Sequence, residues 1–420
     1  MSRSDRKWRR ISIAGRFGAY GLCSRSSAAR WAARRRIFVN NQVIPGRAMK
    51  LGGFVVVSLF SLLPRPGYPQ RGERIQIGAQ PRIVIGAQID GTEEELAWVV
   101  SAAKLSSGRI AIADRGLHQI RVYDQQGRLL GKSGQRGEGP GDFGVIERLW
   151  IGRGDTVFVF DYLLQRVQLF LPNGRFARAW PTFDHSGSLH ALGGYSDGSV
   201  LFESRIPGAA VRETGVRPYQ MRLIRARPNG TRVDTLGTFF GGETLVLMRD
   251  GRVTGSSHVP LGRYAHAIPA GAKTYYLDGS SNEVVAIDSS TRSFALDAEE
   301  TRVSAAEREN RIRDFVESLA NMSPSFIADV RRALSRDLDR PPPLFDSLLV
   351  DRGGAVWARA VRRPAPETST WFVATDGRES FRVDLPAKWQ LLDVGADYVL
   401  IADHDDAGRT TVKEFPITRR

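Results

Sequence analysis

Cysteine is nearly absent from this chain of 420 residues, which contains only Cys23. A single cysteine cannot form a disulfide within the chain, so the hydrophobic core and hydrogen bonds must stabilise the fold. This composition fits the cytoplasm. It also fits a bacterial periplasm, provided that the protein is large enough to be stable without disulfides. The compartment must therefore be inferred from other features.

Several motifs of common enzyme classes are also missing. The six histidines show neither His-x-x-x-His nor His-Glu-x-x-His spacing, so a zinc protease is not supported. No Gly-x-Ser-x-Gly nucleophile elbow is present. The glycine-rich stretch 134–143 is followed by neither Lys-Ser/Thr nor a predicted helix, unlike a phosphate-binding loop. The absence of a catalytic constellation favours a non-enzymatic protein.

Acidic residues are scarce at the N-terminus, which carries most of the net charge of +15. Residues 1–48 contain eleven Arg, one Lys and one Asp, a net charge of +11, which leaves +4 for the other 372 residues. A polyanion partner is therefore expected only for the N-terminal segment. The rest of the chain gives little reason to expect one.

Glycine is plentiful, at 43 residues, and it marks the turns of a repeated unit. One strand ends at Asp114, a second follows over 119–123, and an Asp-x-x-Gly turn closes at Gly127. The same pattern returns at 155–161 and 166–170. A unit of a few tens of residues, built from short strands and glycine turns, is typical of a β-propeller or a solenoid.

Six such units can be placed in residues 71–420. The centres of the last four lie near 197–225, 273–288, 348–377 and 397–415. The sequence therefore predicts an all-β, six-bladed β-propeller of four-stranded units. Two short strands near 74–77 and 82–85 precede the first unit, and one of them is expected to pair with the last blade and close the ring.

The stretch from Gly134 to Phe143, Gly-Gln-Arg-Gly-Glu-Gly-Pro-Gly-Asp-Phe, is the most specific motif of this region. We interpret it as the crossing from the outer strand of one blade to the inner strand of the next, with Phe143 filling the space between blades. Together with the blade pattern, it resembles the bacterial six-bladed propellers related to NHL-repeat proteins. That resemblance implies a propeller fold and export, but no assigned activity.

Residues 301–340 break the repeat and predict a helical hairpin inserted in a blade. Ser304 and Ser323-Pro324 are helix-start patterns, and apolar residues follow each at helical spacing. The insertion either covers one face of the ring or packs on the side of a blade. The sequence leaves both arrangements open.

The sequence predicts that residues 1–48 form a small basic α/β segment. A helix capped by Ser24 and a hairpin turning at Asn40-Asn41 are predicted. The segment 10–46 resembles the RNA-binding module shared by a ribosomal small-subunit protein and many pseudouridine synthases. The matching residues are Gly21, Leu22, Cys23, Ser24, Arg25, Ala28, Arg36, Ile37, Val39, Asn40, Val43 and Ile44.

That resemblance implies salt-sensitive contacts with the RNA backbone. The implied RNA-binding residues are Arg25, Arg30, Arg34, Arg35 and Arg36. Alternatively, residues 1–48 are a basic leader, or upstream coding sequence translated from an early start. RNA is a partner only if these residues are expressed.

The one long apolar run, 51–63, follows Met49-Lys50 and precedes a proline-rich stretch ending at residue 70. This order is typical of a secretory signal, and the run is short for a stable transmembrane span. Translation from Met49 would give a periplasmic or secreted protein, whereas a start at Met1 favours the cytoplasm. A buried strand is the other interpretation of the run. The chain is thus divided into 1–48, 49–70 and 71–420.

Asp114, Asp161, Asp278 and Asp403 recur at the ends of equivalent strands. If they converge at one opening of the ring, they could hold Ca²⁺ or another divalent cation. The alternative is that each caps its own turn by accepting backbone N–H groups. No other cofactor is expected.

Three hypotheses of function follow. The first is an exported, non-enzymatic propeller that binds a peptide, glycan or protein. The second is a propeller hydrolase or lactonase with a metal in the channel. The third is an RNA-associated protein acting through residues 10–46.

Overall fold

The computed structural model describes residues 75–86, 95–182, 188–206, 212–227, 229, 233–288, 291–296, 304–319, 322–361, 367–375, 378–404 and 410–419. By its internal contacts the chain divides into Met1–Arg71 and Gly72–Arg420. All described residues lie in the second unit. The basic segment and the apolar run 51–63 therefore lie outside the described residues.

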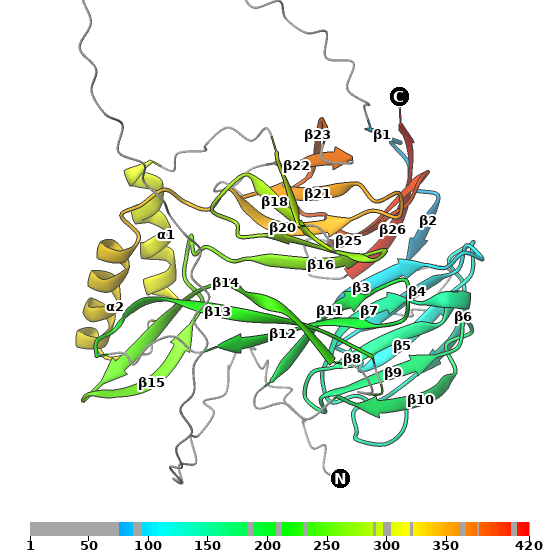
Figure 1. Ribbon diagram of the computed structural model, residues 1–420, viewed down its shortest axis with the longest axis horizontal. Helices are drawn as coiled ribbons and strands as arrows, with labels where there is room; N and C mark the ends of the chain where they lie inside the picture. Colours follow the sequence, from blue (N-terminus) through cyan, green and yellow to red (C-terminus); the bar gives the residue numbers. More distant parts are fainter. Residues whose placement is uncertain are drawn as a thin grey trace, which may run out of the picture. The chain divides into compact units, whose positions relative to one another are not determined.

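The described strands form six antiparallel sheets, which follow one another along the chain (Figure 1). The first two contain four strands each, in sequence order. Their strands are β3 (Val99–Lys104), β4 (Ile110–Asp114), β5 (Gln119–Tyr123), β6 (Leu129–Ser133), β7 (Ile146–Ile151), β8 (Val157–Asp161), β9 (Arg166–Phe170) and β10 (Phe176–Pro181). A 3₁₀ turn, Arg153–Asp155, joins β7 to β8.

The fourth and fifth sheets repeat this arrangement. Their strands are β16 (His266–Ala270), β17 (Lys273–Leu277), β18 (Glu283–Ile287), β19 (Arg292–Ala295), β20 (Phe345–Val350), β21 (Val356–Ala360), β22 (Thr368–Thr375) and β23 (Arg378–Pro386). In each sheet the first strand pairs only with the second, as expected for the inner strand of a blade.

The sixth sheet is completed by the N-terminal end of the unit. It contains β24 (Gln390–Val394), β25 (Tyr398–His404) and β26 (Thr410–Arg419), and both β1 (Ile75–Ile77) and β2 (Ile83–Ile85) pair with β26. The register joins Ile75 to Arg419 and Ile83 to Glu414. The predicted closure of the ring is confirmed, with two strands taking part where one was expected.

The six sheets are the blades of a β-propeller. Their first strands β3, β7, β11, β16 and β20 contact one another in that order, and β24 contacts β3. The backbone N–H of Arg352 donates to the carbonyl of Val394 (3.0 Å), which links the fifth blade to the sixth. The predicted six-bladed fold is therefore confirmed for the described part of the chain.

The hydrophobic core lies between blades, because each sheet packs face to face with its neighbours. One buried cluster joins Ala111 and Val122 of the first blade to Val157 and Val159 of the second. Phe160, one residue further along β8, points to the opposite face and packs against the third blade. The sixth and first blades share such a cluster too. This two-sided burial explains why the strand 157–161 is almost continuously apolar.

The glycine-rich loop takes the predicted path from β6 to β7. Phe143 is fully buried and stacks on Phe170 of the second blade, with ring centroids 5.8 Å apart. Gly134 has φ of 99°, and a Cβ there would lie 2.7 Å from the carbonyl oxygen of His118. Only glycine fits this position without strain. The loop is therefore a structural crossing between blades, as the sequence indicated.

The third blade departs from the prediction of four strands. It contains five, β11 (Leu189–Gly194), β12 (Val200–Ile206), β13 (Gly215–Ala226), β14 (Val233–Arg249) and β15 (Arg252–Ser257). Both β13 and β14 are longer than a blade strand, with 12 and 17 residues. Their extra length forms an arm that also includes β15.

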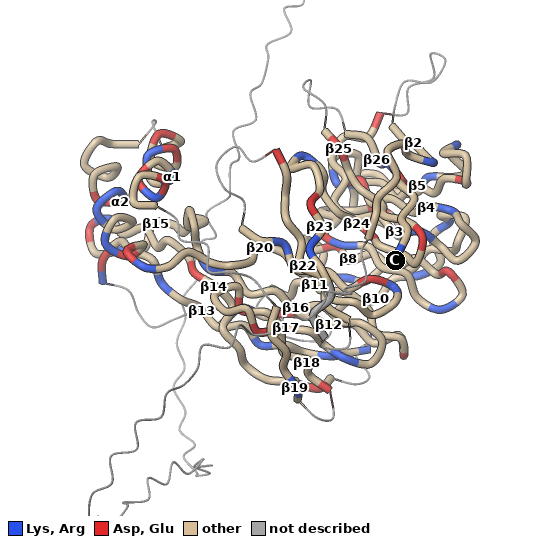
Figure 2. The backbone as a smooth tube through the Cα atoms, turned by 90° about the horizontal axis from the view of Figure 1, so that it is seen from above, with Lys and Arg blue, Asp and Glu red and all other residues tan. Residues whose placement is uncertain are grey.

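Helices α1 (Ala305–Glu317) and α2 (Pro324–Asp337) pack against this arm (Figures 1 and 2). Ser304 accepts the N–H of Glu307 (3.1 Å) and Ser323 that of Phe326 (3.4 Å), so both predicted caps are confirmed. Buried residues of the helices and the arm form one cluster: Leu245, Val259, Ile312, Val316, Val330, Leu334 and Leu338. The hairpin lies between β19 and β20, and so joins two blades. The predicted helical hairpin is confirmed, but its placement within a blade was wrong, because the fourth blade is already complete at β19 when the hairpin begins.

Basic and acidic residues are interspersed over the described sheets (Figure 2). This distribution agrees with the small net charge of residues 49–420. Among the described helices, none combines the length and the apolar character needed to span a membrane.

Candidate functional site: the central channel

A channel of about 1320 Å³ runs between the inner strands of the six blades. Its wall includes residues from β3, β7, β11, β16, β20 and β24. Ligand sites of this volume are large enough for a small molecule or the end of a polymer chain. The channel is therefore the candidate functional site.

Bulges in the inner strands set which side chains line the channel. The register shifts between Val99 and Ser101, Ile146 and Arg148, Ala191 and Gly193, Phe345 and Ser347, and Leu391 and Asp393. The residue that follows each bulge lines the channel, and these residues are Ser101, Arg148, Gly193, Ser347 and Asp393. Three of the five are small, so they leave space. Arg148 is the long cationic side chain of the set.

Arg148 is exposed to the channel and forms no hydrogen bond or ion pair with any described residue. The protein atoms that surround the channel desolvate its guanidinium and lower the pKa, and the charges of Glu147 and Glu203 oppose this shift. Trp150, two residues further along β7, leaves the strand on the same face and also lines the channel. Its indole lies across Gly194, where an added Cβ would clash with Nε1 of the indole.

The carboxylates that line the channel are occupied by donors of the protein itself. Asp155 accepts from the backbone N–H and the hydroxyl of Ser106 (both 2.8 Å). Asp351 accepts from the backbone N–H groups of Gly353 and Ala355 (2.9 Å each), the indole N–H of Trp357 (3.1 Å) and the guanidinium of Arg419 (2.6 Å). These acids therefore neutralise little of the positive charge of the channel wall.

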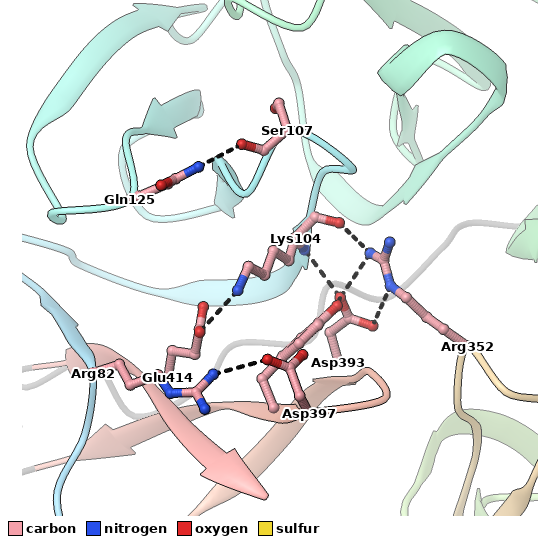
Figure 3. A network of polar contacts seen from close by, with 9 residues as sticks. Arg82, Lys104, Ser107, Gln125, Arg352, Asp393, Asp397 and Glu414 are labelled. Atoms are coloured by element: carbon pink, nitrogen blue, oxygen red, sulfur yellow. Dashed lines mark hydrogen bonds and ion pairs between the residues drawn. The ribbon is translucent and has the colours of Figure 1, made fainter.

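The third acid, Asp393, belongs to a network at the seam of the ring (Figure 3). It accepts from Arg352 (2.8 Å), from the backbone N–H of Lys104 (2.9 Å) and from the hydroxyl of Tyr398 (2.8 Å). Lys104 in turn forms an ion pair with Glu414 (2.8 Å). The network joins the fifth, sixth and first blades, so its role is structural.

A second polar cluster surrounds the start of β7 and β11. His190 donates from Nδ1 to Glu147 Oε1 (2.5 Å) and stacks on Tyr162, with centroids 4.6 Å apart. Glu203 lies opposite His190 in the β11–β12 register. Burial lowers the pKa of His190, but the hydrogen bond to Glu147 and the charges of Glu147 and Glu203 outweigh it, so this pKa is raised. Burial raises the pKa of Glu203.

His266, the first residue of β16, is half-buried. Burial lowers its pKa to about 4, the charge of Asp346 opposes this shift, and Arg359 and Arg148 add to it. Its Nε2 is buried and has no hydrogen-bond partner among the described residues. This pKa makes stability depend on pH, as argued below.

Three of the four predicted metal-binding aspartates have backbone partners within their own blade. Asp114 accepts from Ala97, Trp98 and Leu117, and Asp161 from Gly144, Val145 and Leu164, at 2.8–3.1 Å. Asp278 accepts from Ser280 (2.8 Å) and Ser281 (2.9 Å). The contacts of all three aspartates match the alternative in which each aspartate caps its own turn by accepting backbone N–H groups.

Asp403 instead pairs with Lys413 (2.6 Å) and Lys388 (3.5 Å). In the described part of the chain, no group of three or more His, Cys, Asp or Glu residues is arranged to hold a metal ion. The structure therefore does not bring the four aspartates together. Cation binding stays a prediction that solution experiments must test.

The five predicted RNA-binding arginines, Arg25, Arg30, Arg34, Arg35 and Arg36, lie outside the described residues. Sequence reasoning missed Arg148 and the Glu147–His190 pair. Glu147 and Arg148 follow Phe143 by four and five residues, which is a usable signal once the crossing is recognised. His190 and Glu203 carry no such signal, because another blade brings them into place.

Comparison with known proteins shows the fold of the chain. No family model matches it, and no curated protein matches its sequence. A solved structure of a DUF4221 family member from Bacteroides vulgatus is similar at a TM-score of 0.51, with 11% identity over 84% of this chain and 100% of the other. At this identity the similarity concerns the fold alone.

Two further solved structures are similar at lower scores. A protein from Bacteroides fragilis that is described as exported has a TM-score of 0.46, with 11% identity over 82% of this chain and 95% of its own. Virginiamycin B lyase from Staphylococcus aureus has a TM-score of 0.41, with 8% identity over 81% and 99%. The resemblances to NHL-repeat proteins and to an RNA-binding module find no support in these comparisons.

Proposed function

We propose that the protein is an exported, non-enzymatic β-propeller that binds a ligand in its central channel. The observation that carries this proposal is the channel itself, with about 1320 Å³ of space and a wall contributed by all six blades. Small residues at Ser101, Gly193 and Ser347 keep it open. A small molecule or the end of a peptide or glycan fits a space of this size.

Export is the second part of the proposal, and it rests on the sequence. Met49-Lys50, the apolar run 51–63 and the proline-rich stretch that follows have the order of a secretory signal. Mass spectrometry of fractionated native cells tests it. We expect a mature N-terminus near residues 64–72 in the envelope fraction, and a full-length cytoplasmic chain would contradict export.

Channel binding is tested by filling the channel. We expect Ser347→Trp to occupy the lumen while the protein still folds, because Ser347 follows a bulge and its side chain faces open space. Lys132→Trp on the outer strand β6 is the matched control. Organic acids, peptides and oligosaccharides are screened for ligands that raise the melting temperature of the wild type.

A channel ligand should stabilise the wild type and Lys132→Trp, but not Ser347→Trp, because only the folded, open form binds it. Equal stabilisation of all three proteins would place the binding site elsewhere. No stabilisation by any member of the three classes would contradict the proposed function.

A further inference from the structure

The channel wall has an uneven charge balance that indicates the class of ligand. Its charged residues include Arg148, Lys273, Arg352, Arg359 and Lys388, against the three carboxylates described above. Arg352 pairs with Asp393 (2.8 Å) and Arg359 with Asp346 (2.6 Å). Arg148 lines the same wall and is left without a hydrogen-bonded or ion-paired partner among the described residues.

The neighbouring acids act on Arg148 only through their electric field, without a direct hydrogen bond or ion pair. Glu147 is bound by His190 Nδ1 (2.5 Å) and by the backbone N–H of Ala191 (3.2 Å). Glu203 lies within electrostatic range, but it forms no ion pair with Arg148. A guanidinium presents several N–H donors in a planar fork, which matches the two oxygens of a carboxylate or phosphate group.

The surroundings of Arg148 supply both space and an apolar surface. The equivalent positions on β3, β11 and β20 are Ser101, Gly193 and Ser347, so the lumen beside the guanidinium is open. Trp150 lies on the same face of β7 and stacks on Phe158 in parallel, at 5.7 Å and 5° between planes. This stacking fixes the indole at the channel wall.

We propose that the channel binds an organic anion, whose carboxylate or phosphate group is held by Arg148 and whose apolar part packs against Trp150. The inference rests on the proposed function and adds the chemical class of the ligand.

The test uses the full chain and four compounds in isothermal titration calorimetry at millimolar concentration. Benzoate and phenyl phosphate carry the anionic group and a ring, benzyl alcohol carries the ring alone, and inorganic phosphate carries the charge alone. We expect both organic anions to bind more tightly than benzyl alcohol or inorganic phosphate. The stronger of the two identifies the preferred anionic group.

Two variants of Arg148 and one control examine the role of the guanidinium. Arg148→Gln should weaken binding of the better anion at least about tenfold, since a hydrogen-bonded charge pair is lost. Arg148→Lys should retain part of the affinity, because the charge remains while the fork is lost. Lys132→Gln removes the same charge from an exposed site on β6 and should have no effect.

Glu203→Gln separates this inference from a pairing of Arg148 with Glu203. Removing that negative charge should leave anion binding unchanged or strengthen it. A loss as large as that of Arg148→Gln would overturn the inference, as would equal binding by Arg148→Gln and the wild type, or no binding of either organic anion. If a neutral ligand binds and Ser347→Trp blocks it, the proposed function stands while the anion inference fails.

Discussion

Lys104 of the first blade and Glu414 of the last form an ion pair of 2.8 Å across 310 residues of sequence. Glu414 is 2% exposed and Lys104 19%, so the pair is largely removed from water. The ammonium group also lies 4.6 Å from the ring centroid of Tyr398. Together with β1 and β2, this contact holds the ring closed (Figure 3).

Removing one partner of this pair should destabilise the protein more than removing both. Lys104→Met leaves the carboxylate of Glu414 uncompensated and should lower the free energy of unfolding by about 3 kcal/mol. The double variant Lys104→Met/Glu414→Leu should recover much of that loss. Arg82→Gln, which breaks the exposed pair with Asp397, is the control and should cost less than about 1 kcal/mol. Urea unfolding measures the stability of all three variants, and a double variant less stable than Lys104→Met alone would contradict the coupling.

The N-terminal strands should contribute unequally to closure. Ile85 of β2 is 1% exposed and packs with Leu96, Tyr398 and Val412, whereas Ile75 of β1 is only partly buried. Ile85→Ala should therefore cost about 3 kcal/mol, because it leaves a cavity in the core between the last and first blades. Ile75→Ala should cost clearly less. Equal losses in urea unfolding would show that β1 closes the ring as strongly as β2.

Gly134 should tolerate no side chain. Gly134→Ala combines a positive φ with a Cβ 2.7 Å from a backbone oxygen, so we expect a loss of about 2 kcal/mol or more. Gly154 has φ of 65° and no heavy atom within 4 Å of an added Cβ. Gly154→Ala should therefore lower the free energy of unfolding by about 1 kcal/mol, because only the left-handed backbone conformation is unfavourable for alanine there. Equal losses would mean that the contact at Gly134 relaxes without strain.

Stability should fall as the pH is lowered, in part because of His266. Its pKa is about 4 in the folded protein, below the ordinary value of 6.5, so the unfolded chain binds more protons between these values. The contribution is fully present above pH 6.5 and is lost as the pH falls toward 4. His266→Gln cannot be protonated, so its stability should depend less on pH in this window. Parallel pH profiles from urea unfolding would contradict this assignment.

Chelation tests the remaining metal hypothesis. The backbone and lysine contacts of Asp114, Asp161, Asp278 and Asp403 need no cation. We therefore expect EDTA to leave the melting temperature unchanged, and added Ca²⁺ to have no effect. A drop in EDTA that Ca²⁺ reverses would restore the proposal of a bound cation, and with it the hypothesis of a metal-dependent propeller enzyme.

The sequence alone determined the repeat, the crossings and the helix caps. Alternating apolar residues, Asp-x-x-Gly turns and the stretch 134–143 act over short distances, and Ser304 and Ser323 bond to residues three positions away. These features depend on residues that are close in sequence, so the sequence alone is enough to predict them. The strands near 75–85 were assigned to closure because a propeller without it would expose sheet edges.

Only the tertiary structure decided the arm of the third blade and the content of the channel. The helices 305–337 are apolar on one face, but their partner is a strand extension encoded some 60 residues earlier, which no local pattern reveals. Arg148, Trp150, His190 and Glu203 meet because two blades lie side by side. Whether a charged residue is paired depends on all the side chains around it. Those neighbours are set only when the blades come together in the closed ring.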